Sequence, residues 1–398
     1  MLEQQYKFNF KTAENRIVFQ PMEGCDCSYD GSPSEITERK YGRLAEGGAG
    51  MIWLEAATVC REARTNPRQM LIDEKNSGAF ARLVDEIRKK AFVSTGTVPL
   101  LILQLTHSGR QSMQPLIMYD NPVYKKNGER YQMATDEYLD GLPDKFAKAA
   151  KLAIRAGFDG VDVKACHGYL LAESLSAFER KGRYGGSFEN RSRLFLDCAK
   201  AVAAVCGRSV LASRVGITDM VRKPWGFGTD ENGNADLTEA LILLRYLKDI
   251  GMEIINVTVG NPYYNPHINR PFRHGPYITP EKPEEGLARF YTLTKAVKKA
   301  NESMAFVMSG LTYYAERALE TAESFLKENA CDFAGFGRET IAYPSFYFDW
   351  KNGVSDKRKM CVLCSKCTEM MRRGQVSGCA VHDVFYRNIY KENVRCAK

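Results

Sequence analysis

The stretch VDVKACHGYL begins as an apolar strand and then places Lys164, Cys166, His167 and Tyr169 within six residues. An isolated His or Tyr at the end of a strand is usually a polar residue whose hydrogen bonds are satisfied in the core. Lys164, His167 and Tyr169 stand together at such a position, and they are candidate catalytic residues beside that alternative. Cys166 is interpreted as a packing residue rather than a nucleophile.

A second group of reactive side chains lies near the C-terminus, in the stretch CVLCSKCTEMMRRGQVSGC. Cys361, Cys364, Cys367 and Cys379 have the spacing C-x2-C-x2-C-x11-C. Three thiolates on one short loop and a fourth on a returning segment suit a [4Fe–4S] cluster, whereas zinc sites more often present two separated pairs. We predict a cluster, with a zinc ion or four unliganded thiols as the alternatives.

The elements that must position these side chains are eight apolar runs separated by amphipathic segments. The runs cover residues 16–21, 50–56, 99–105, 160–165, 210–216, 254–260, 305–310 and 332–337. Amphipathic segments at residues 80–92, 142–157, 235–251 and 315–330 predict helices between them. Such alternation indicates a parallel sheet covered by helices, and eight units favour closure. We therefore predict an α/β protein with a (β/α)8 TIM barrel over residues 1–350 and a C-terminal cysteine-rich extension over residues 351–398.

In such a barrel the active site lies at the C-terminal ends of the strands. Unusual polar residues follow most of the runs, and we expect them to line one bowl: Glu23 with Cys25, Glu55, Gln104 with His107, Lys164 to Tyr169, Arg214, and Gly337 with Arg338. Residues 110–135 and 260–277 are too long for ordinary barrel connections and are interpreted as lids, with surface decoration as the alternative. Their basic residues are predicted to grip an anionic substrate or a nucleotide phosphate, with a solvated loop as the alternative: Lys125, Lys126, Arg130, Arg270 and Arg273.

Composition narrows the class of protein. An apolar fraction of 44% and a charged fraction of 26% are those of an ordinary soluble globular chain. The formal charge of +8 is interpreted as spread along the helices and as a mild preference for anionic small molecules, because no nucleic-acid-binding motif is present. The absence of an export signal or membrane-spanning window predicts a cytoplasmic protein with reduced cysteines and no membrane partner. A homo-oligomer is compatible with the sequence.

Several motifs lie at or after the predicted strands: PMEG, LQLTHSGR, GFDGVDVKACHGYLLAESLSAFERKGRYGGSFENR, ASRVG, SGL and GFGR. Together they resemble the motifs of the Old Yellow Enzyme family of FMN-dependent NAD(P)H oxidoreductases. The resemblance covers roughly residues 8–348, and the long fourth-strand motif is highly specific. With its cysteine tail, the chain is most similar to the branch of 2,4-dienoyl-CoA reductase and trimethylamine dehydrogenase.

The resemblance implies an FMN site in the bowl. It places Gly310, Gly337 and Arg338 at the phosphate, Arg214 near N1 and O2 of the ring, and Gln104 at the pyrimidine edge. A structural Arg paired to a carboxylate is the alternative for Arg214. The remaining residues expected to line the flavin are Pro21, Met22, Glu23 and Ala57. Glu23 stands where relatives often carry Thr or Cys, and because a carboxylate there would repel the reduced ring, it is expected to be protonated or to point away.

The resemblance also implies roles for the opening cluster of side chains. Tyr169 matches the family's proton donor, His167 matches one of two residues that hold a substrate carbonyl, and Lys164 replaces the other. A lysine suits a carboxylate, thioester or enolate better than a neutral imidazole does. The implied reaction is reduction of a C=C bond in an enone, an α,β-unsaturated acid or an acyl-CoA, with hydride from FMN N5.

The sequence is compatible with two sources of electrons, NAD(P)H and a partner protein. Members of the cluster-bearing branch continue into a half that binds FAD and a pyridine nucleotide, but no G-x-G-x-x-G follows any predicted strand here. Electrons are therefore expected from NAD(P)H docking over the FMN or from a partner protein through the cluster. The alternatives for the whole function are an amine dehydrogenase of the trimethylamine dehydrogenase type and a non-catalytic electron-transfer module.

Overall fold

Eight parallel strands close into a barrel in the computed structural model, which describes residues 1–125, 130–275 and 277–395. Around the ring they follow the chain: β3 (Ile17–Phe19), β4 (Met51–Thr58), β5 (Leu100–Thr106), β8 (Gly160–Val163), β9 (Val210–Thr218), β10 (Ile254–Val259), β11 (Ala305–Met308) and β12 (Phe333–Phe336), which pairs with β3. All eight apolar runs are therefore strands, and the predicted TIM barrel is confirmed.

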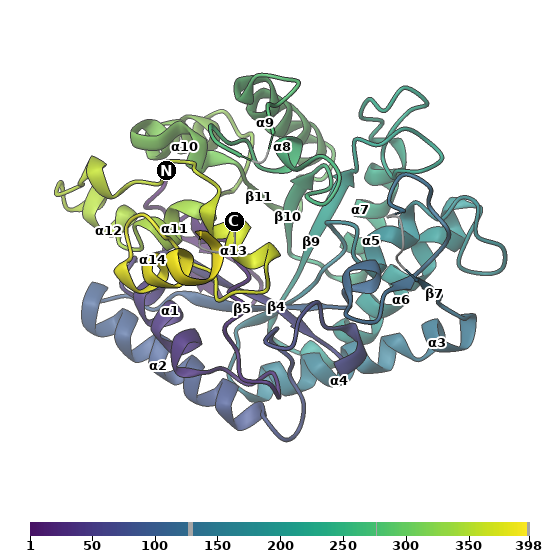
Figure 1. Cartoon of the computed structure of the whole chain (residues 1–398), viewed down its shortest axis with the longest axis horizontal. Helices are drawn as coiled ribbons and strands as arrows, with labels where there is room; N and C mark the ends of the chain where they lie inside the picture. The colour runs from purple at the N-terminus through teal and green to yellow at the C-terminus, as the bar shows by residue number, and fades with distance from the viewer. Residues whose placement is uncertain (126–129, 276, 396–398) are drawn as a thin grey trace.

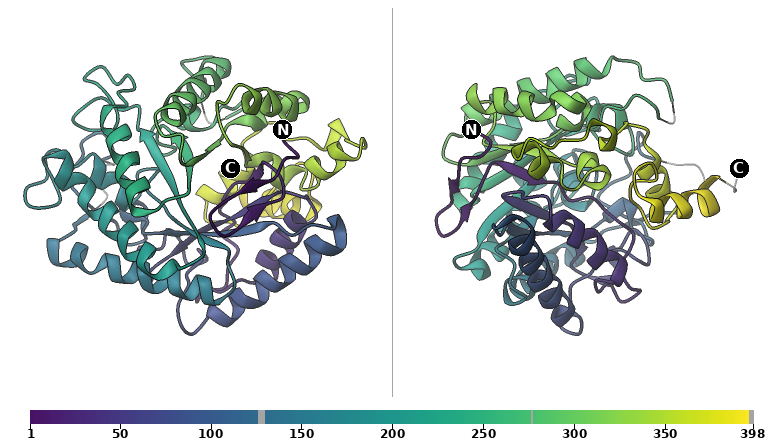
Figure 2. Two further views of the ribbon diagram at one scale, coloured as in Figure 1. Left: turned by 180° about the vertical axis from the view of Figure 1, so that it is seen from behind. Right: turned by 90° about the vertical axis from the view of Figure 1, so that its left-hand side faces the viewer.

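Helices cover the outside of the ring (Figures 1 and 2). The longer ones are α1 (Glu35–Ala45), α2 (Ser77–Thr95), α4 (Leu142–Arg155), α6 (Phe188–Cys206), α7 (Thr238–Ile250), α9 (Pro283–Lys299) and α10 (Ala318–Lys327). Their ends follow local chemistry: Ser34 caps α1 in a capping box with Thr37, and Gly96 and Gly251 end α2 and α7 in left-handed conformation. No described helix is long and apolar enough to cross a membrane.

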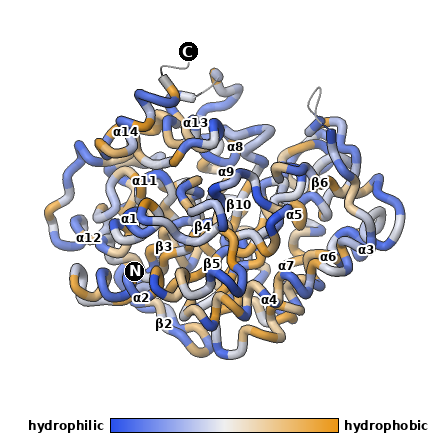
Figure 3. The backbone as a smooth tube through the Cα atoms, turned by 60° about the horizontal axis from the view of Figure 1, so that its bottom comes forward, coloured by the Kyte–Doolittle hydropathy of each residue, from blue (hydrophilic) through white to orange (hydrophobic). Residues whose placement is uncertain are grey.

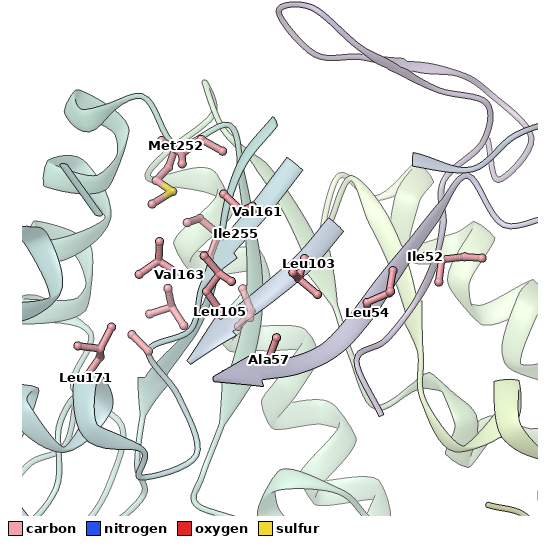
Figure 4. Close-up of a cluster of buried hydrophobic side chains, with 14 of the residues drawn as sticks. Ile52, Leu54, Ala57, Leu103, Leu105, Val161, Val163, Leu171, Met252 and Ile255 are labelled. Atoms are coloured by element: carbon pink, nitrogen blue, oxygen red, sulfur yellow. The ribbon is translucent and has the colours of Figure 1, made fainter. Parts of the chain in front are cut away.

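Alternate strand residues divide the core into two layers. Leu54, Leu103, Val161 and Ile255 point outward and pack beneath the helices (Figure 4). Residues such as Trp53 and Ile102 point inward and fill the N-terminal half of the barrel. The hairpin of β1 (Tyr6–Lys7) and β2 (Thr12–Ala13) closes that end, so the polar positions that follow along each strand face the opposite mouth.

Short elements surround this mouth. They are η1 (Arg61–Ala63), η2 (Gly109–Gln111), β6 (Leu116–Ile117), β7 (Gln132–Met133), α3 (Asp136–Asp140), α5 (Leu170–Leu175), α8 (Pro266–Asn269), η3 (Leu311–Arg317) and α11 (Arg338–Ala342), whereas α12 (Phe346–Lys351) packs on the outside of the ring against Phe19. They occupy the connections that follow the strands, including both segments interpreted as lids. The residues that these connections carry are therefore available to line the mouth.

The C-terminal extension lies at the mouth, at the opposite end of the molecule from β2 (Figure 3). It consists of η4 (Lys357–Lys359), α13 (Lys366–Arg372), α14 (Val384–Tyr390) and a final helical turn (Lys391–Arg395). Polar contacts attach it to the barrel loops: Arg270 donates to Thr368 at 2.7 Å, and the Ser377 amide donates to the Gly24 carbonyl at 2.7 Å. The extension therefore forms part of the wall of the mouth.

Candidate functional site

One cavity at the mouth brings together most of the barrel residues expected to bind FMN or to act in catalysis. Eleven of these twelve residues line it: Pro21, Met22, Glu23, Gln104, Lys164, His167, Tyr169, Arg214, Gly310, Gly337 and Arg338. They come from the ends of six strands and from the loops that follow. Because each strand alternates, its last inward-facing residue meets those of its neighbours at this end.

Ala57 is the exception and corrects the expectation. Its methyl group lies with Leu54 and Leu103 in the helix-facing core, and Ala56 lines the cavity in its place (Figure 4). The pairing of β4 with β5 shifts register between Leu54 and Ala57. Such an irregularity reverses the inward and outward alternation, which strict counting along the strand could not foresee.

A buried carboxylate organises the floor of the cavity. Asp162 accepts hydrogen bonds from Gln104 Nε2 at 2.6 Å, Trp53 Nε1 at 2.8 Å and the Arg214 amide at 2.7 Å. Burial raises the pKa of Asp162 to about 6. The Arg214 guanidinium forms no ion pair among the described residues and its Nε has no hydrogen-bond partner there. Arg214 can therefore face a bound ligand, unlike the structural Arg that was the alternative.

His167 is held in an unusual backbone conformation that turns it into the cavity. It has φ +64°, followed by Gly168 at +65°, and left-handed backbone at a non-glycine residue is uncommon. Its buried Nε2 has no partner among the described residues. Burial, with the positive charges of Arg214 and Lys164, holds the pKa of His167 well below its usual value. The ring is therefore neutral, with a free nitrogen available to a ligand.

The Lys164 ammonium group lies over the ring of Tyr169. The Lys164 Nζ is 3.7 Å from the centroid of the Tyr169 ring, a cation–π contact. Burial lowers the pKa of Lys164 and raises the pKa of Tyr169. The phenol is therefore protonated at neutral pH, and a positive charge stands beside it that would favour the phenolate formed when the proton leaves.

Tyr263 joins this group from the long loop after β10, and sequence reasoning missed it. Its hydroxyl lies 3.3 Å from that of Tyr169, and its ring is 6.3 Å away, centroid to centroid. Tyr169 is only 3% exposed, whereas Tyr263 is 38% exposed. The two hydroxyls therefore form a pair inside the cavity, which Tyr263 also lines. The only signal in the sequence was the PYY triplet within the loop interpreted as a lid.

Glu23 lines the cavity, and its carboxylate is tied to the wall. It accepts from Thr65 Oγ1 at 3.0 Å and from Asn66 Nδ2 at 2.9 Å. Both donors come from the loop that follows β4. These hydrogen bonds direct the carboxylate toward the loop.

Three arginines meet at the other end of the cavity. Arg338 donates to the Pro271 carbonyl at 2.6 Å, Arg372 to the Pro262 carbonyl at 2.9 Å, and Arg270 to Thr368. Burial and the neighbouring Arg338 and Arg372 lower the pKa of Arg270 to about 10. Among the described residues none of the three pairs with a carboxylate. This end of the cavity is therefore suited to an anion such as a phosphate. Arg372 is exposed and also lines the rim.

Several other residues expected in the bowl lie outside it. His107 lines a separate cavity, where its Nε2 shares a hydrogen bond of 2.8 Å with the Tyr138 hydroxyl. Glu55 is buried in an ion pair with Lys40. Cys25 is also buried and does not line the main cavity. Of the basic loop residues only Arg270 lines the cavity. Lys126 lies outside the described residues.

The four cysteines of the tail line a second cavity next to the first. Left-handed residues Leu363 and Ser365 fold their loop tightly. Arg338 lines both cavities, and Cys367 shares a small adjoining pocket with Met22 and Glu23.

The donor set tests which metal group these cysteines could hold. In the described part of the chain, no three His, Cys, Asp or Glu side chains are grouped as a bound metal ion would require. Four thiols around one cavity are the soft ligands that both an iron–sulfur cluster and a structural zinc ion use. The donor set therefore fits either group, and the choice between them rests on the spacing of the cysteines.

Comparison with known proteins identifies relatives of the whole barrel. The NADH:flavin oxidoreductase / NADH oxidase family matches residues 4–357. An NADH oxidase of Thermoanaerobacter brockii is 27% identical over 364 residues, which are 88% of this chain and 50% of that protein. The chain thus spans about half the length of this relative.

Solved structures share the fold. A complex of 2-naphthoyl-CoA reductase aligns with a TM-score of 0.80 at 20% identity, over 96% of this chain and 56% of that chain. A morphinone reductase mutant in complex with tetrahydroNAD aligns with a TM-score of 0.66 at 21% identity, over 90% of this chain and 93% of that chain.

Proposed function

Because the chain belongs to the NADH:flavin oxidoreductase / NADH oxidase family, we propose that it is an FMN-dependent reductase of C=C bonds activated by a carbonyl group. The substrates of this reaction are enones, α,β-unsaturated acids or acyl thioesters. One observation carries the proposal: a buried phenol, a neutral imidazole and an ammonium group meet in one cavity at the mouth of the barrel.

The cavity offers suitable residues for both ends of FMN, the isoalloxazine ring and the phosphate. Arg214 and Gln104 would hold the ring, and Gly310, Gly337 and Arg338 would hold the phosphate. Two unpaired buried nitrogens, Arg214 Nε and Arg338 Nη1, support this assignment. A side chain at position 337 would approach the Met22 sulfur to 3.0 Å, so glycine keeps this part of the wall open. Bound FMN supplies the hydride for one alkene carbon.

Tyr169 supplies the proton for the other alkene carbon. Its raised pKa keeps the phenol protonated until charge develops on the substrate, and Lys164 then stabilises the phenolate. The free nitrogen of His167 and the Lys164 ammonium hold the carbonyl oxygen, where negative charge accumulates. The Tyr263 hydroxyl returns a proton to Tyr169 across the 3.3 Å contact.

Charge in the cavity argues for an acidic or strongly polarised substrate. Lys164 lines it beside Tyr169, is not assigned to the flavin, and has no ion pair among the described residues. An amine dehydrogenase would bind a cationic ammonium group, which the charge of Lys164 would repel. A non-catalytic module would not need the phenol, imidazole and ammonium group in one cavity.

Cys361, Cys364, Cys367 and Cys379 hold a [4Fe–4S] cluster in this proposal, as their soft donor set supports. Electrons come from NAD(P)H at the mouth or from a partner protein. The absorption spectrum of the anaerobically purified protein tests both cofactors, because a flavin gives resolved visible bands and an iron–sulfur centre adds a broad shoulder to them.

An anaerobic stopped-flow experiment tests the reaction. The protein is reduced with NADH or NADPH and mixed with cyclohexenone, a 2-enoic acid or an enoyl thioester. We expect rapid stoichiometric reoxidation by at least one of them, with the saturated product. Reduction of the protein without reoxidation by any member of the panel would favour an electron-transfer module instead.

A further inference from the structure

The net positive charge of the chain is concentrated in the C-terminal extension, whereas we expected it to be spread along the helices. Residues 351–398 contain eleven lysines and arginines and only four aspartates and glutamates, a balance of +7 within a total of +8. The preceding 350 residues hold 45 basic and 44 acidic residues and are nearly neutral. The segment with the four cysteines is thus also the basic segment of the chain.

The basic residues that precede the first cysteine are exposed, whereas Lys366, between Cys364 and Cys367, is half-buried. Arg358 and Lys357 have side chains 90% and 75% exposed, and they precede Cys361 by only three and four residues. Each has one acidic partner, Asp356 and Glu316. Lys359 and Lys366 instead lie 5.2 Å and 5.4 Å from the ring centroids of Tyr343 and Tyr390, with no acidic partner among the described residues.

An apolar residue sits among these charges. Val362 lines the cysteine cavity and is 48% exposed, and Lys366 lines the same cavity. The four cysteines are themselves partly exposed. Figure 2 shows the extension standing out from the barrel at the edge of the molecule, where another protein could approach it.

We propose that this surface, formed by Lys357, Arg358, Lys359, Val362 and Lys366 and called here the basic cap, docks an acidic one-electron carrier protein. The inference rests on the proposed cluster, because the cap borders the cavity of the four cysteines. Charged rims steer oppositely charged proteins together, and redox encounters use small interfaces. The basic cap has both features, because exposed Val362 is surrounded by basic residues and the patch is small.

The electron balance fixes the number of encounters. Each docked carrier is oxidised by one electron, so two successive encounters supply the two electrons that reduce one C=C bond. Two protons from water complete the reaction. No further reductant is needed.

The binding test uses the purified holoprotein and an acidic plant-type ferredoxin as the probe, measured by surface plasmon resonance. We expect binding that weakens at least tenfold between 20 and 200 mM salt. The double variant Arg358→Glu and Lys359→Glu should bind at least tenfold more weakly at 20 mM salt. Lys89→Glu, an exposed lysine on α2, is the matched control and should bind like the wild type.

Two outcomes would overturn the docking surface: equal affinity of the double variant and the wild type, or no binding of the ferredoxin while RNA or anionic vesicles bind in a salt-dependent manner. Stopped-flow reoxidation of chemically reduced protein by the alkene panel runs in parallel. If that reaction fails while the ferredoxin still binds at the cap, the proposed function is wrong and the docking surface stands.

Discussion

Replacing Tyr169 by Phe removes one hydroxyl group from the centre of the cavity and leaves its surroundings in place. The aromatic ring still fills its buried position and still lies under Lys164. The hydroxyl contacts only the hydroxyl of Tyr263, at 3.3 Å among the described residues. Loss of this neutral hydrogen bond should reduce the free energy of unfolding by about 1 kcal/mol, so the variant should fold and bind FMN.

The effect on the reaction should be much larger. A positioned general acid contributes roughly 10²- to 10⁴-fold to a rate, which corresponds to about 3 to 5 kcal/mol in the barrier. We expect Tyr169→Phe to slow alkene-dependent reoxidation by this factor while reduction by NAD(P)H is unchanged. Anaerobic stopped-flow absorbance separates the two half-reactions.

A matched variant controls for the loss of any buried phenol. Tyr347 is buried outside the cavity and its hydroxyl has no partner among the described residues, so Tyr347→Phe should leave both half-reactions unchanged. Alkene-dependent reoxidation of Tyr169→Phe within threefold of the wild type would refute the role of this phenol.

Four further predictions concern neighbouring residues. Tyr263→Phe should slow steady-state turnover about tenfold and spare the first turnover, as rapid-quench measurements would show. Lys164→Met should raise KM for a 2-enoic acid more than for a neutral enone, and equal effects would argue against a charge contact. Cys364→Ser should lower the iron content without loss of FMN, measured by elemental analysis. Burial raises the pKa of Asp162 to about 6 from 3.8, so the folded protein retains a proton that the unfolded chain loses between these values, and stability falls as pH rises through this window. Asp162→Asn should flatten that decline in Tm between pH 4 and pH 6.

The barrel and most of its site could be predicted from the sequence because strand periodicity constrains both. Inward-facing residues at the ends of parallel strands must converge, so Gln104, Lys164 and Arg214 were placed correctly from their positions along three apolar runs. The same rule failed at β4, where an irregular pairing exchanged Ala56 for Ala57. The rule also could not show that Glu55 forms a buried ion pair with Lys40 and therefore does not line the cavity.

The remaining site residues depend on contacts between segments distant in sequence. Tyr263 reaches Tyr169 because the loop after β10 folds back across the mouth, and Arg372 reaches the rim because α13 packs on that loop. No local pattern encodes these contacts, since loop conformation is set by the partners that each loop meets. The concentration of charge in the extension was available in the sequence, but its meaning required the position of the extension beside the cavity.

Proton delivery by Tyr169 is the central claim, and the stereochemistry of protonation tests it most directly. The measurement is reduction of an α-methyl enone in D₂O, followed by NMR analysis of the deuterium at the α carbon. The account predicts deuterium on one face of the α carbon with the wild type, and slow reduction with deuterium on both faces with Tyr169→Phe. Single-face deuteration at an unchanged rate in Tyr169→Phe would contradict it.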